Sequence, residues 1–594
     1  MGVRWPYCTR LCGAPEGISA ADHLTVMKHG LGTIVGLGVV VLGTTAPAWP
    51  DDLPAADSGP DVHDTVNSAT FSGGGPAALL APAALEASGA VIGSVTIVND
   101  SIFDLDDPEE NKSLFRLANR LHIRTRPDVI QQQLLFAPGD KFSTQSLEES
   151  ERILRANRYI DEVSVRPVRQ DKGVVDVSVE TNDVWTLMPK FSVSRSGGQN
   201  NTAIGLKEQN LLGSGTAIEV LFKSDVDRDS RVLKYRDRNL GHSWYGLELD
   251  YYDNSDGYLQ FIEIGQPFYS LDSRRAQGFS IRNEERIGTF YDRGEIASEY
   301  HEEALSYELS RGWSSGLRNG WTRRYTAGLA YDEHRFAAVE DSAYSTSPLP
   351  ADRQLLTPFV GVEIVEDRFE KSSNHDQINR IEDRFLGTRI NARLGVARQS
   401  AGSDRDAWLL NIGAQTGFGS SANSSLIVAS KLAGRIEQGG AQNVTLDASA
   451  SYYKRQSDRR LLYMGLSGTY GSNADLDQLL VLGGETGLRG YPLRFQTGDS
   501  RAVFTIEQRY FTDWYPFRLF HVGGAVFFDV GRTWGESPVG AADSQLLRDV
   551  GFGLRIGSSR SGLGRMIHVD VAVPLDDTDG IDGVQLLVST RKSF

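Results

Sequence analysis

The most extensive pattern in the chain is an alternation of apolar and polar positions in its C-terminal two thirds. From about residue 184 to residue 594, segments of ten to fifteen residues alternate in polarity and are separated by Gly, Asn, Asp and Ser. A β-strand with one apolar and one polar face produces this period of two. A long series of such strands is typical of a transmembrane β-barrel, and a soluble β-sandwich or propeller is the alternative.

Segments near the C-terminus favour the membrane. In residues 567–575, Ile and Val occupy one face, while His568 and Asp570 occupy the other. Residues 518–530 alternate in the same way, with Asp529 on the small and polar face. Because charges that face lipid at mid-depth are costly, we expect these side chains to point into a lumen.

The ends of the segments carry a second signal. Aromatic residues gather there, as they do in the interfacial girdles of membrane barrels. Phe594 closes an amphipathic last segment, which is typical of proteins that the outer-membrane insertion machinery recognises. Residues 335–352 and 369–383 are predicted to form longer loops.

Residues 90–183 have a different character and predict a small α+β domain. Ser146 followed by Glu149 resembles a capping box at the start of its second helix. Alternating valines mark its last two strands. The expected elements are a strand over 90–100, helices over 126–135 and 146–159, and strands over 160–170 and 173–183.

The N-terminal region predicts export. Met27 is followed by a short polar head, an apolar run over 31–42 and a small-residue cleavage site ending at Ala48. This is the three-part pattern of a signal peptide, and the run is too short for an anchor helix. We therefore interpret residues 1–48 as a signal region whose true start is Met27. The Pro-, Ala- and Gly-rich residues 49–89 predict a flexible linker.

Composition and motifs exclude several classes of function. The formal net charge of −16 argues against a nucleic-acid partner, which requires a basic face. The only cysteines, Cys8 and Cys12, precede the signal and would be absent from the exported chain. No histidine lies in a recognisable catalytic or metal-binding setting. We expect no enzymatic activity, no catalytic residue, no metal and no cofactor.

A glycine-dense stretch over 481–495, VLGGETGLRGYPLRF, is the most specific feature. It lies between barrel segments and carries Arg489. Downstream, Glu507 and Asp529 fall on the inferred lumen face. A buried arginine needs a carboxylate partner, so an Arg489 carried inward by the loop is expected to pair with a carboxylate on this face. If Arg489 alone is buried and paired, Arg489→Ala lowers function more than Arg494→Ala.

The motif GLRGY, together with FFDVG at 527–531, resembles the paired signature of the BamA/TamA-like outer-membrane protein superfamily, also called bacterial surface antigen proteins. Residues 204–222 resemble an early barrel hairpin of that family. The domain over 90–182 resembles a POTRA (polypeptide-transport-associated) domain.

The resemblance implies a fold and a set of site residues. It implies an antiparallel barrel of about sixteen strands over 184–594, with a weak seam between segments near 187–197 and 584–594. The sequence departs from the family pattern in one respect, because we find a single POTRA-like domain and no plug helix. The implied lumen residues are Leu488, Arg489, Gly490 and Tyr491 in the loop, and Gly531 and Asp529 on the partner strand, where Asp529 receives Arg489. Alternation adds Glu507 to the lumen-facing partners.

Function follows as an expectation. The leading hypothesis is a Gram-negative outer-membrane barrel, with its POTRA-like domain in the periplasm, that helps to insert or translocate polypeptides, or lipids. Its expected partners are outer-membrane lipid, extended or unfolded polypeptide clients and periplasmic accessory proteins. The alternative is a passive pore or structural protein that kept the fold without a client, because fold alone does not determine function. A third class, a lipase-like barrel enzyme, would need a Ser-His-acid constellation at one rim, and no histidine of the sequence lies in a recognisable setting for one.

Overall fold

The computed structural model describes residues 80–591, except positions 197–198, 226, 538, 540–544, 563–565, 577–580 and 582. The described residues all belong to one structural unit. The expected signal region, most of the expected linker and Phe594 lie outside the described residues. Within the described part of the chain, no helix is long and apolar enough to cross a membrane.

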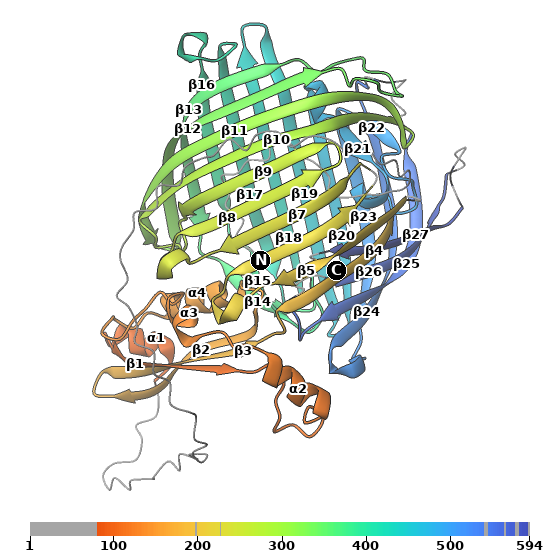
Figure 1. Cartoon of the computed structure of the whole chain (residues 1–594). Helices are drawn as coiled ribbons and strands as arrows, with labels where there is room; N and C mark the ends of the chain where they lie inside the picture. Colours follow the sequence, from red (N-terminus) through yellow and green to blue (C-terminus); the bar gives the residue numbers. More distant parts are fainter. Residues whose placement is uncertain are drawn as a thin grey trace, which may run out of the picture. The chain divides into compact units, whose positions relative to one another are not determined.

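Alternating valines build the three-stranded sheet of the N-terminal domain (Figure 1). β1 (Val91–Asp100) runs parallel to β3 (Val174–Asp183), and β2 (Ile160–Asp171) pairs with β3 in the antiparallel sense. The valines at alternate positions of β3 are fully buried, since residues two apart on a strand share a face. α3 (Pro127–Gln131) and α4 (Thr144–Arg155) contribute apolar side chains to the same core.

Three local predictions in this domain were wrong. α4 begins before the predicted capping box, because Ser143 is the N-cap and its hydroxyl accepts the N–H of Ser146. Residues 82–87 of the expected linker form α1 (Pro82–Ala87), whose Leu85 is fully buried in the domain core. Burial of this one leucine extends the domain at its N-terminal end. The sequence prediction also missed α2 (Ser113–Leu121), which lies between β1 and α3.

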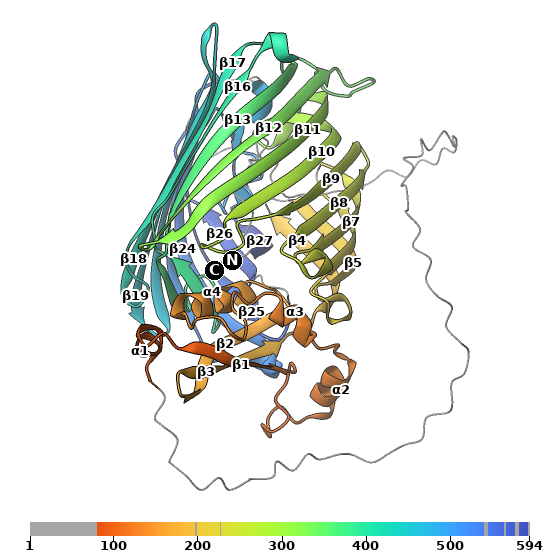
Figure 2. The ribbon, with the colours of Figure 1, turned by 90° about the vertical axis from the view of Figure 1, so that its left-hand side faces the viewer.

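The C-terminal region forms one large antiparallel sheet that curves into a barrel (Figures 1 and 2). Exposed apolar side chains alternate with inward-facing polar ones, as on β26, where His568 and Asp570 are buried between more exposed Ile and Val residues. The strands are β4 (Leu187–Ser196), β5 (Gln199–Glu208), β6 (Ala217–Ser224), β7 (Asp229–Asp237), β8 (Gly246–Asn254), β9 (Gly257–Gln266), β10 (Arg275–Asp292), β11 (Glu295–Arg318), β12 (Trp321–Ala337), β13 (Arg353–Glu366), β16 (Arg389–Ala397), β17 (Ala407–Ser420), β18 (Ser424–Glu437), β19 (Gly440–Ser457), β20 (Arg460–Ser472), β23 (Ser500–Phe511), β24 (Phe520–Trp534), β25 (Leu547–Ser558), β26 (Met566–Pro574) and β27 (Gln585–Arg591).

The described residues therefore place twenty strands in this sheet, whereas the family resemblance implied about sixteen. Each strand pairs with its neighbours in chain order through its own antiparallel ladder, and none is half of a longer strand divided at a bulge. The additional strands are independent hairpin arms.

The junction between the first and last strands differs from the others. Among the residues that the structure describes, β27 and β4 are registered at one position, Val588 opposite Arg195. The neighbouring junction between β26 and β27 is registered continuously from Met566–Arg591 to Ala572–Gln585. We call the β27–β4 junction the seam. Its described register is the shortest of any junction in the wall.

Candidate functional site

Residues 473–499, between β20 and β23, form what we call the arginine loop. β21 (Leu480–Leu482) and β22 (Gln496–Gly498) pair within it as a short antiparallel ladder. Gly483 has a φ angle of +130°, and a Cβ there would lie 2.0 Å from a carbonyl oxygen across the loop. Only glycine tolerates this conformation and this close approach. The tight turn brings the following Arg489 against the barrel wall.

Arg489 is buried on the lumen side of β23 and β24. Its Nε and Nη2 lie 2.7 and 3.0 Å from the two carboxylate oxygens of Asp529, as a bidentate pair. Its Nη1 lies 3.0 Å from Oε2 of Glu507, and its guanidinium carbon lies 3.2 Å from the centroid of the Phe527 ring. The structure thus brings together the three charged residues singled out in the sequence. Removing one partner of such a buried set leaves a charge without compensation.

The ionic network extends beyond these residues. Nε of Arg509 lies 2.9 Å from Oε1 of Glu507, and Nη2 of Arg555 lies 3.3 Å from Oε2 of the same carboxylate. Nη1 of Arg555 also lies 2.5 Å from Asp570. The sequence analysis did not single out Arg555, although it lies on the buried face of β25 by strict alternation. Glu507 is the centre of the network because three arginines contact it.

The two residues after Arg489 extend the contact to β25. The amide of Gly490 donates to Oδ2 of Asp549 at 2.9 Å, and a Cβ on Gly490 would lie 2.6 Å from the Cβ of Asp549. The Tyr491 hydroxyl lies 2.9 Å from Oδ2 of Asp576. Leu488 and Tyr491 are fully buried in one apolar cluster. Each residue of the Leu-Arg-Gly-Tyr motif therefore has a specific contact with the wall.

The structure places Gly531 on β24, where a Cβ would lie 3.0 Å from the carbonyl oxygen of Ala502 on β23. A larger residue there would push these two strands apart. Phe594, the expected barrel signal, lies outside the described residues.

Arg494 lies on the opposite side of the same loop and is also paired. Its Nη1 and Nη2 lie 2.7 and 2.6 Å from the two oxygens of Asp227, and its guanidinium carbon lies 4.3 Å from the centroid of the Tyr291 ring. The condition on which the sequence analysis compared Arg489→Ala with Arg494→Ala is therefore not met, because both arginines are buried and paired. Sequence alternation gave no signal for this pair, because Asp227 lies in a turn between β6 and β7.

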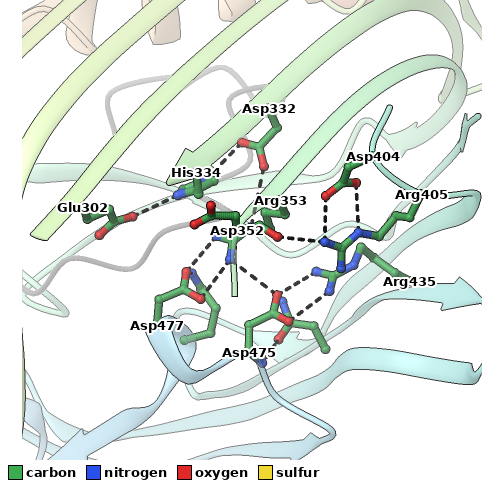
Figure 3. Close-up of polar contacts among 12 residues, drawn as sticks. Glu302, Asp332, His334, Asp352, Arg353, Asp404, Arg405, Arg435, Asp475 and Asp477 are labelled. Carbon is green, nitrogen blue, oxygen red and sulfur yellow. Dashed lines mark hydrogen bonds and ion pairs between the residues drawn. The ribbon is translucent and has the colours of Figure 1, made fainter. Parts of the chain in front are cut away.

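The beginning of the arginine loop is held by a third set of ion pairs (Figure 3). The guanidinium of Arg353 on β13 contacts both oxygens of Asp477 at 2.9 and 2.7 Å. Arg435 on β18 contacts both oxygens of Asp475 at 2.7 and 2.9 Å. Because bidentate pairs fix orientation as well as distance, the loop is anchored to the wall at its start.

One group within this cluster has the residue types of a metal site. The ligand atoms of Glu302, His334 and Asp477 lie within 4.8 Å of one another. Arg286 lies 2.7 Å from Glu302, however, and Arg353 holds Asp477. The two carboxylates are already neutralised by arginines, so the cluster anchors the loop to the wall through ion pairs.

The arginine loop connects the two sides of the seam. On one side it is paired with Asp227, which follows β6. On the other side it is paired with Asp529 on β24 and Asp549 on β25. Side-chain contacts of the loop therefore join strands from both ends of the sheet, where the backbone ladder is shortest.

A second inserted segment lies at the periplasmic side of the lumen. β14 (Phe369–Ser373) and β15 (Ile381–Phe385) form a hairpin between β13 and β16, and we call residues 367–388 the mouth hairpin. Ile378 at its tip is buried, and Arg509 donates to the carbonyl of His375 at 2.6 Å. Contacts with such distant strands extend the hairpin across the mouth of the barrel. The cluster around Ile378 contains Tyr453, Leu461, Phe511, Ala525 and Met566.

The mouth hairpin is also tied to the N-terminal domain. Nη1 of Arg155 on α4 lies 2.5 Å from Asp383, and Nζ of Lys371 lies 2.7 Å from Glu151 on α4. Arg155 is buried, whereas half of the Lys371 side chain is exposed. The sequence analysis predicted only a long loop over 369–383. The short strands and their partners gave no periodic signal.

Burial at this contact changes the ionisation of two acids of the N-terminal domain. Burial raises the pKa of Glu149, although its carboxylate accepts the amide of Leu271 at 2.8 Å. Burial also raises the pKa of Asp161, against the opposing effect of Arg380. Both carboxyls are less easily ionised here than in water, since desolvation disfavours the charged form.

β1 is an edge strand of the N-terminal sheet. Its beginning is covered, because Ile92 donates its amide to the carbonyl of Asp140 at 2.8 Å. In the part of the chain that the structure describes, no strand pairs with the outer side of residues 95–100. The other edge strand, β2, contains Pro167, which has no N–H to donate. The outer side of residues 95–100 is therefore the better template for an incoming strand.

Comparison with protein families agrees with this architecture. A model described as the Omp85 superfamily domain matches residues 368–591, which include the arginine loop and strands β16–β27. A model described as POTRA, surface antigen variable number repeat, matches residues 122–182. No curated protein matches the chain.

Solved structures similar to the chain include BamA from Haemophilus ducreyi lacking POTRA domains 1–3, with 13% identity, a TM-score of 0.36 and 84% of each chain covered. CdiB from Acinetobacter baumannii has 12% identity and a TM-score of 0.42, over 84% of this chain and 73% of that one. CdiB from Escherichia coli has 14% identity and a TM-score of 0.43, over 84% and 76%.

Fold, lumen motif and family matches define the class as outer-membrane β-barrel proteins with a periplasmic POTRA domain. Within that class, the Omp85 superfamily match over residues 368–591 and the POTRA match over residues 122–182 support a BamA/TamA-like protein. The barrel lies in the outer membrane and the POTRA domain in the periplasm. At the level of the family, the function is insertion or translocation of proteins at that membrane.

Proposed function

We propose that this chain inserts polypeptides into the outer membrane at its seam, and that it does so without catalysing a chemical reaction. The observation that carries the proposal is the short register between β27 and β4, which is a single pair among the described residues. Elsewhere in the wall, backbone groups are satisfied by continuous ladders, and separating two strands there would expose many of them to lipid. The seam is the place where separation costs least.

An extended client first meets the POTRA domain. The outer side of β1 at residues 95–100 offers an unpaired strand edge, and pairing of an incoming strand with such an edge is β-augmentation. Main-chain hydrogen bonds supply the affinity, so one edge accepts clients of different sequence. Periplasmic accessory proteins would deliver these clients.

The mouth hairpin favours the lateral route over passage through the lumen. Its buried tip packs against strands on the far side of the barrel, and its ion pairs with α4 hold it there. A passive pore would require the mouth hairpin to move out of the mouth of the barrel. The arginine loop keeps the barrel intact while the seam opens, because its ion pairs join both sides of the seam.

The test is a disulfide cross-link between the two strands of the seam, which we call the seam lock. Cysteines at positions 195 and 588 occupy directly opposed positions in an antiparallel pair, a geometry that permits a disulfide. The control carries cysteines at 428 and 450, an opposed pair within the ladder between β18 and β19. Cells depleted of the native protein are complemented with each variant, and the outer-membrane proteome is measured with and without a reductant.

We expect depletion to lower a defined set of barrels, the control pair to restore the set, and the seam lock to restore it only after reduction. Full complementation by the oxidised seam lock contradicts lateral insertion. An unchanged proteome after depletion contradicts a role in insertion altogether, and planar-bilayer conductance then tests the passive pore.

A further inference from the structure

The segment between β1 and α3, residues 101–123, is an insertion into the POTRA domain that has its own small core. The rings of Phe103 and Phe115 stack with their centroids 4.3 Å apart. The side chain of Asn119 accepts the amide of Phe103 at 3.1 Å and donates to its carbonyl at 2.8 Å. These contacts give α2 a fixed position on the domain.

The insertion is also attached to the periplasmic end of the barrel. Arg560, between β25 and β26, donates to the carbonyl of Ile102 at 2.7 Å and lies 2.5 Å from Glu110. Arg518, between β23 and β24, is paired with Glu109. Because two separate turns of the wall contact the insertion, α2 is held at the level of the periplasmic rim.

One side of α2 is apolar and exposed. Leu114, Leu117 and Leu121 are 64%, 48% and 62% exposed, and their spacing of three and four residues places them on one helix face. Soluble domains seldom leave three aligned leucines uncovered. The buried Phe115 shows that the helix already uses a different face to pack on its own domain.

The polar positions of the same helix are basic. Residues 112–124 contain four cationic side chains and no acidic one, in a chain of formal net charge −16. All four are exposed. Leucines on one face and cations beside them form the pattern of a helix that lies in a membrane interface and contacts anionic headgroups. The cations are Lys112, Arg116, Arg120 and Arg124.

The neighbouring turn of the barrel has the same character. Trp514 and Phe517, between β23 and β24, are 63% and 80% exposed. They precede the exposed Phe520 at the start of β24, on the lipid-facing side of the wall. Tryptophan and phenylalanine at this depth are typical of the membrane boundary. The lipid-facing surface of the barrel therefore continues into the turn that contacts the insertion.

We propose that α2 and the β23–β24 turn dock on the periplasmic leaflet of the outer membrane, with the leucines of α2 in the acyl-chain boundary and its basic residues on anionic phospholipid headgroups. This docking holds the POTRA domain against the membrane beside the C-terminal strands. It depends on the location of the barrel and not on the proposed insertion of clients.

The test places a fluorescent probe on the helix in the full chain. Cys8 and Cys12 are replaced by serine, and bimane is attached to Leu117→Cys or, as the control, to Val168→Cys on β2. These two positions are matched in exposure, at 48% and 47%. The proteins are placed in nanodiscs of phosphatidylethanolamine and phosphatidylglycerol, with plain or brominated acyl chains. Iodide serves as the quencher from the water phase.

We expect brominated lipid to lower bimane emission at position 117 by about twofold or more, and to leave position 168 unchanged. Arg116→Glu with Arg120→Glu should remove most of this quenching, as should nanodiscs of phosphatidylcholine alone. Heat-modifiable migration confirms that the charge-reversed barrel is folded. Quenching that survives both changes overturns the role of anionic headgroups.

Two further outcomes overturn the docking itself. Strong quenching by iodide with none by brominated lipid means that the face is in water. Protection from both quenchers means that a protein surface, either a second copy or an accessory partner, covers the helix.

Discussion

Two junctions of the barrel wall lie close to the arginine loop and are held in different ways. β24 and β25 are registered continuously from Phe520–Ser558 to Gly531–Leu547. In the described part of the chain, β27 and β4 share only the pair of Val588 and Arg195. The first junction is stabilised by its backbone ladder. The second depends on side chains, because the loop pairs with residues on both sides of it.

The difference between these two junctions indicates which interactions a movable junction requires. A long ladder opens only when many hydrogen bonds break together, and in lipid no water replaces them. Buried ion pairs away from the junction resist the same separation but leave the strand edges themselves unpaired. Under the proposed function, the seam opens locally while the arginine loop keeps the remaining wall in register.

The largest expected effect comes from Arg489→Ala. The change leaves Asp529 and Glu507 buried without their shared cation, which costs about 3–5 kcal/mol. We expect the barrel to lose its heat-modifiable band and to become sensitive to protease. Arg532→Ala is the control, because Arg532 is an exposed arginine on the same strand. Equal behaviour of the two variants would show that the network does not hold the loop.

Arg494→Ala tests the other side of the seam and should have a smaller effect. Its partner Asp227 retains 22% exposure, so water compensates part of the loss. We expect about 2–3 kcal/mol in urea unfolding of the full chain, since hydrogen bonds to charged groups are worth this much. The yield of the 195–588 disulfide should fall, because the N-terminal strands are released. An unchanged disulfide yield would mean that the ion pair between Arg494 and Asp227 does not stabilise the seam.

Gly490→Ala makes a smaller change within the motif. The added Cβ would lie 2.6 Å from the Cβ of Asp549, so the loop must move away from β25. Forcing one methyl group into a packed site costs about 1–2 kcal/mol. Gly439→Ala is the control, since a Cβ there meets nothing within 4 Å. A stability as high as that of the control would mean that the loop adapts without strain.

Much of this architecture could be predicted from the sequence, wherever apolar and polar residues alternate with a regular period. Two-residue alternation identified the barrel and placed Asp529 and Glu507 on the lumen face, and the same rule identifies Arg555. The glycine-dense motif marked the loop, because glycine is needed wherever backbones approach closely. Valine alternation likewise marked the POTRA sheet.

The remaining features have no period. Arg494 pairs with a turn residue far away in the chain, and no local pattern connects the two. The mouth hairpin consists of five-residue strands whose partners lie across the lumen. α2 is the exception, because Leu114, Leu117 and Leu121 recur at helical spacing and this signal was overlooked. The expected strand number differs from that of the described sheet because it was taken from the family resemblance.

The smallest expected effect concerns the contact between the POTRA domain and the mouth hairpin, and it compares two ion pairs of different burial. Arg155→Ala removes a buried guanidinium from Asp383 and Glu151, whereas Lys371→Ala removes an ammonium that is half exposed. A surface pair contributes about 0–1 kcal/mol, so Lys371→Ala should leave planar-bilayer conductance at the level of the unmodified chain. Arg155→Ala should raise conductance, because the hairpin loses its buried tie to α4 and leaves the mouth more often. If neither variant conducts more, the packing around Ile378 alone holds the hairpin, and the POTRA domain does not control the mouth of the barrel.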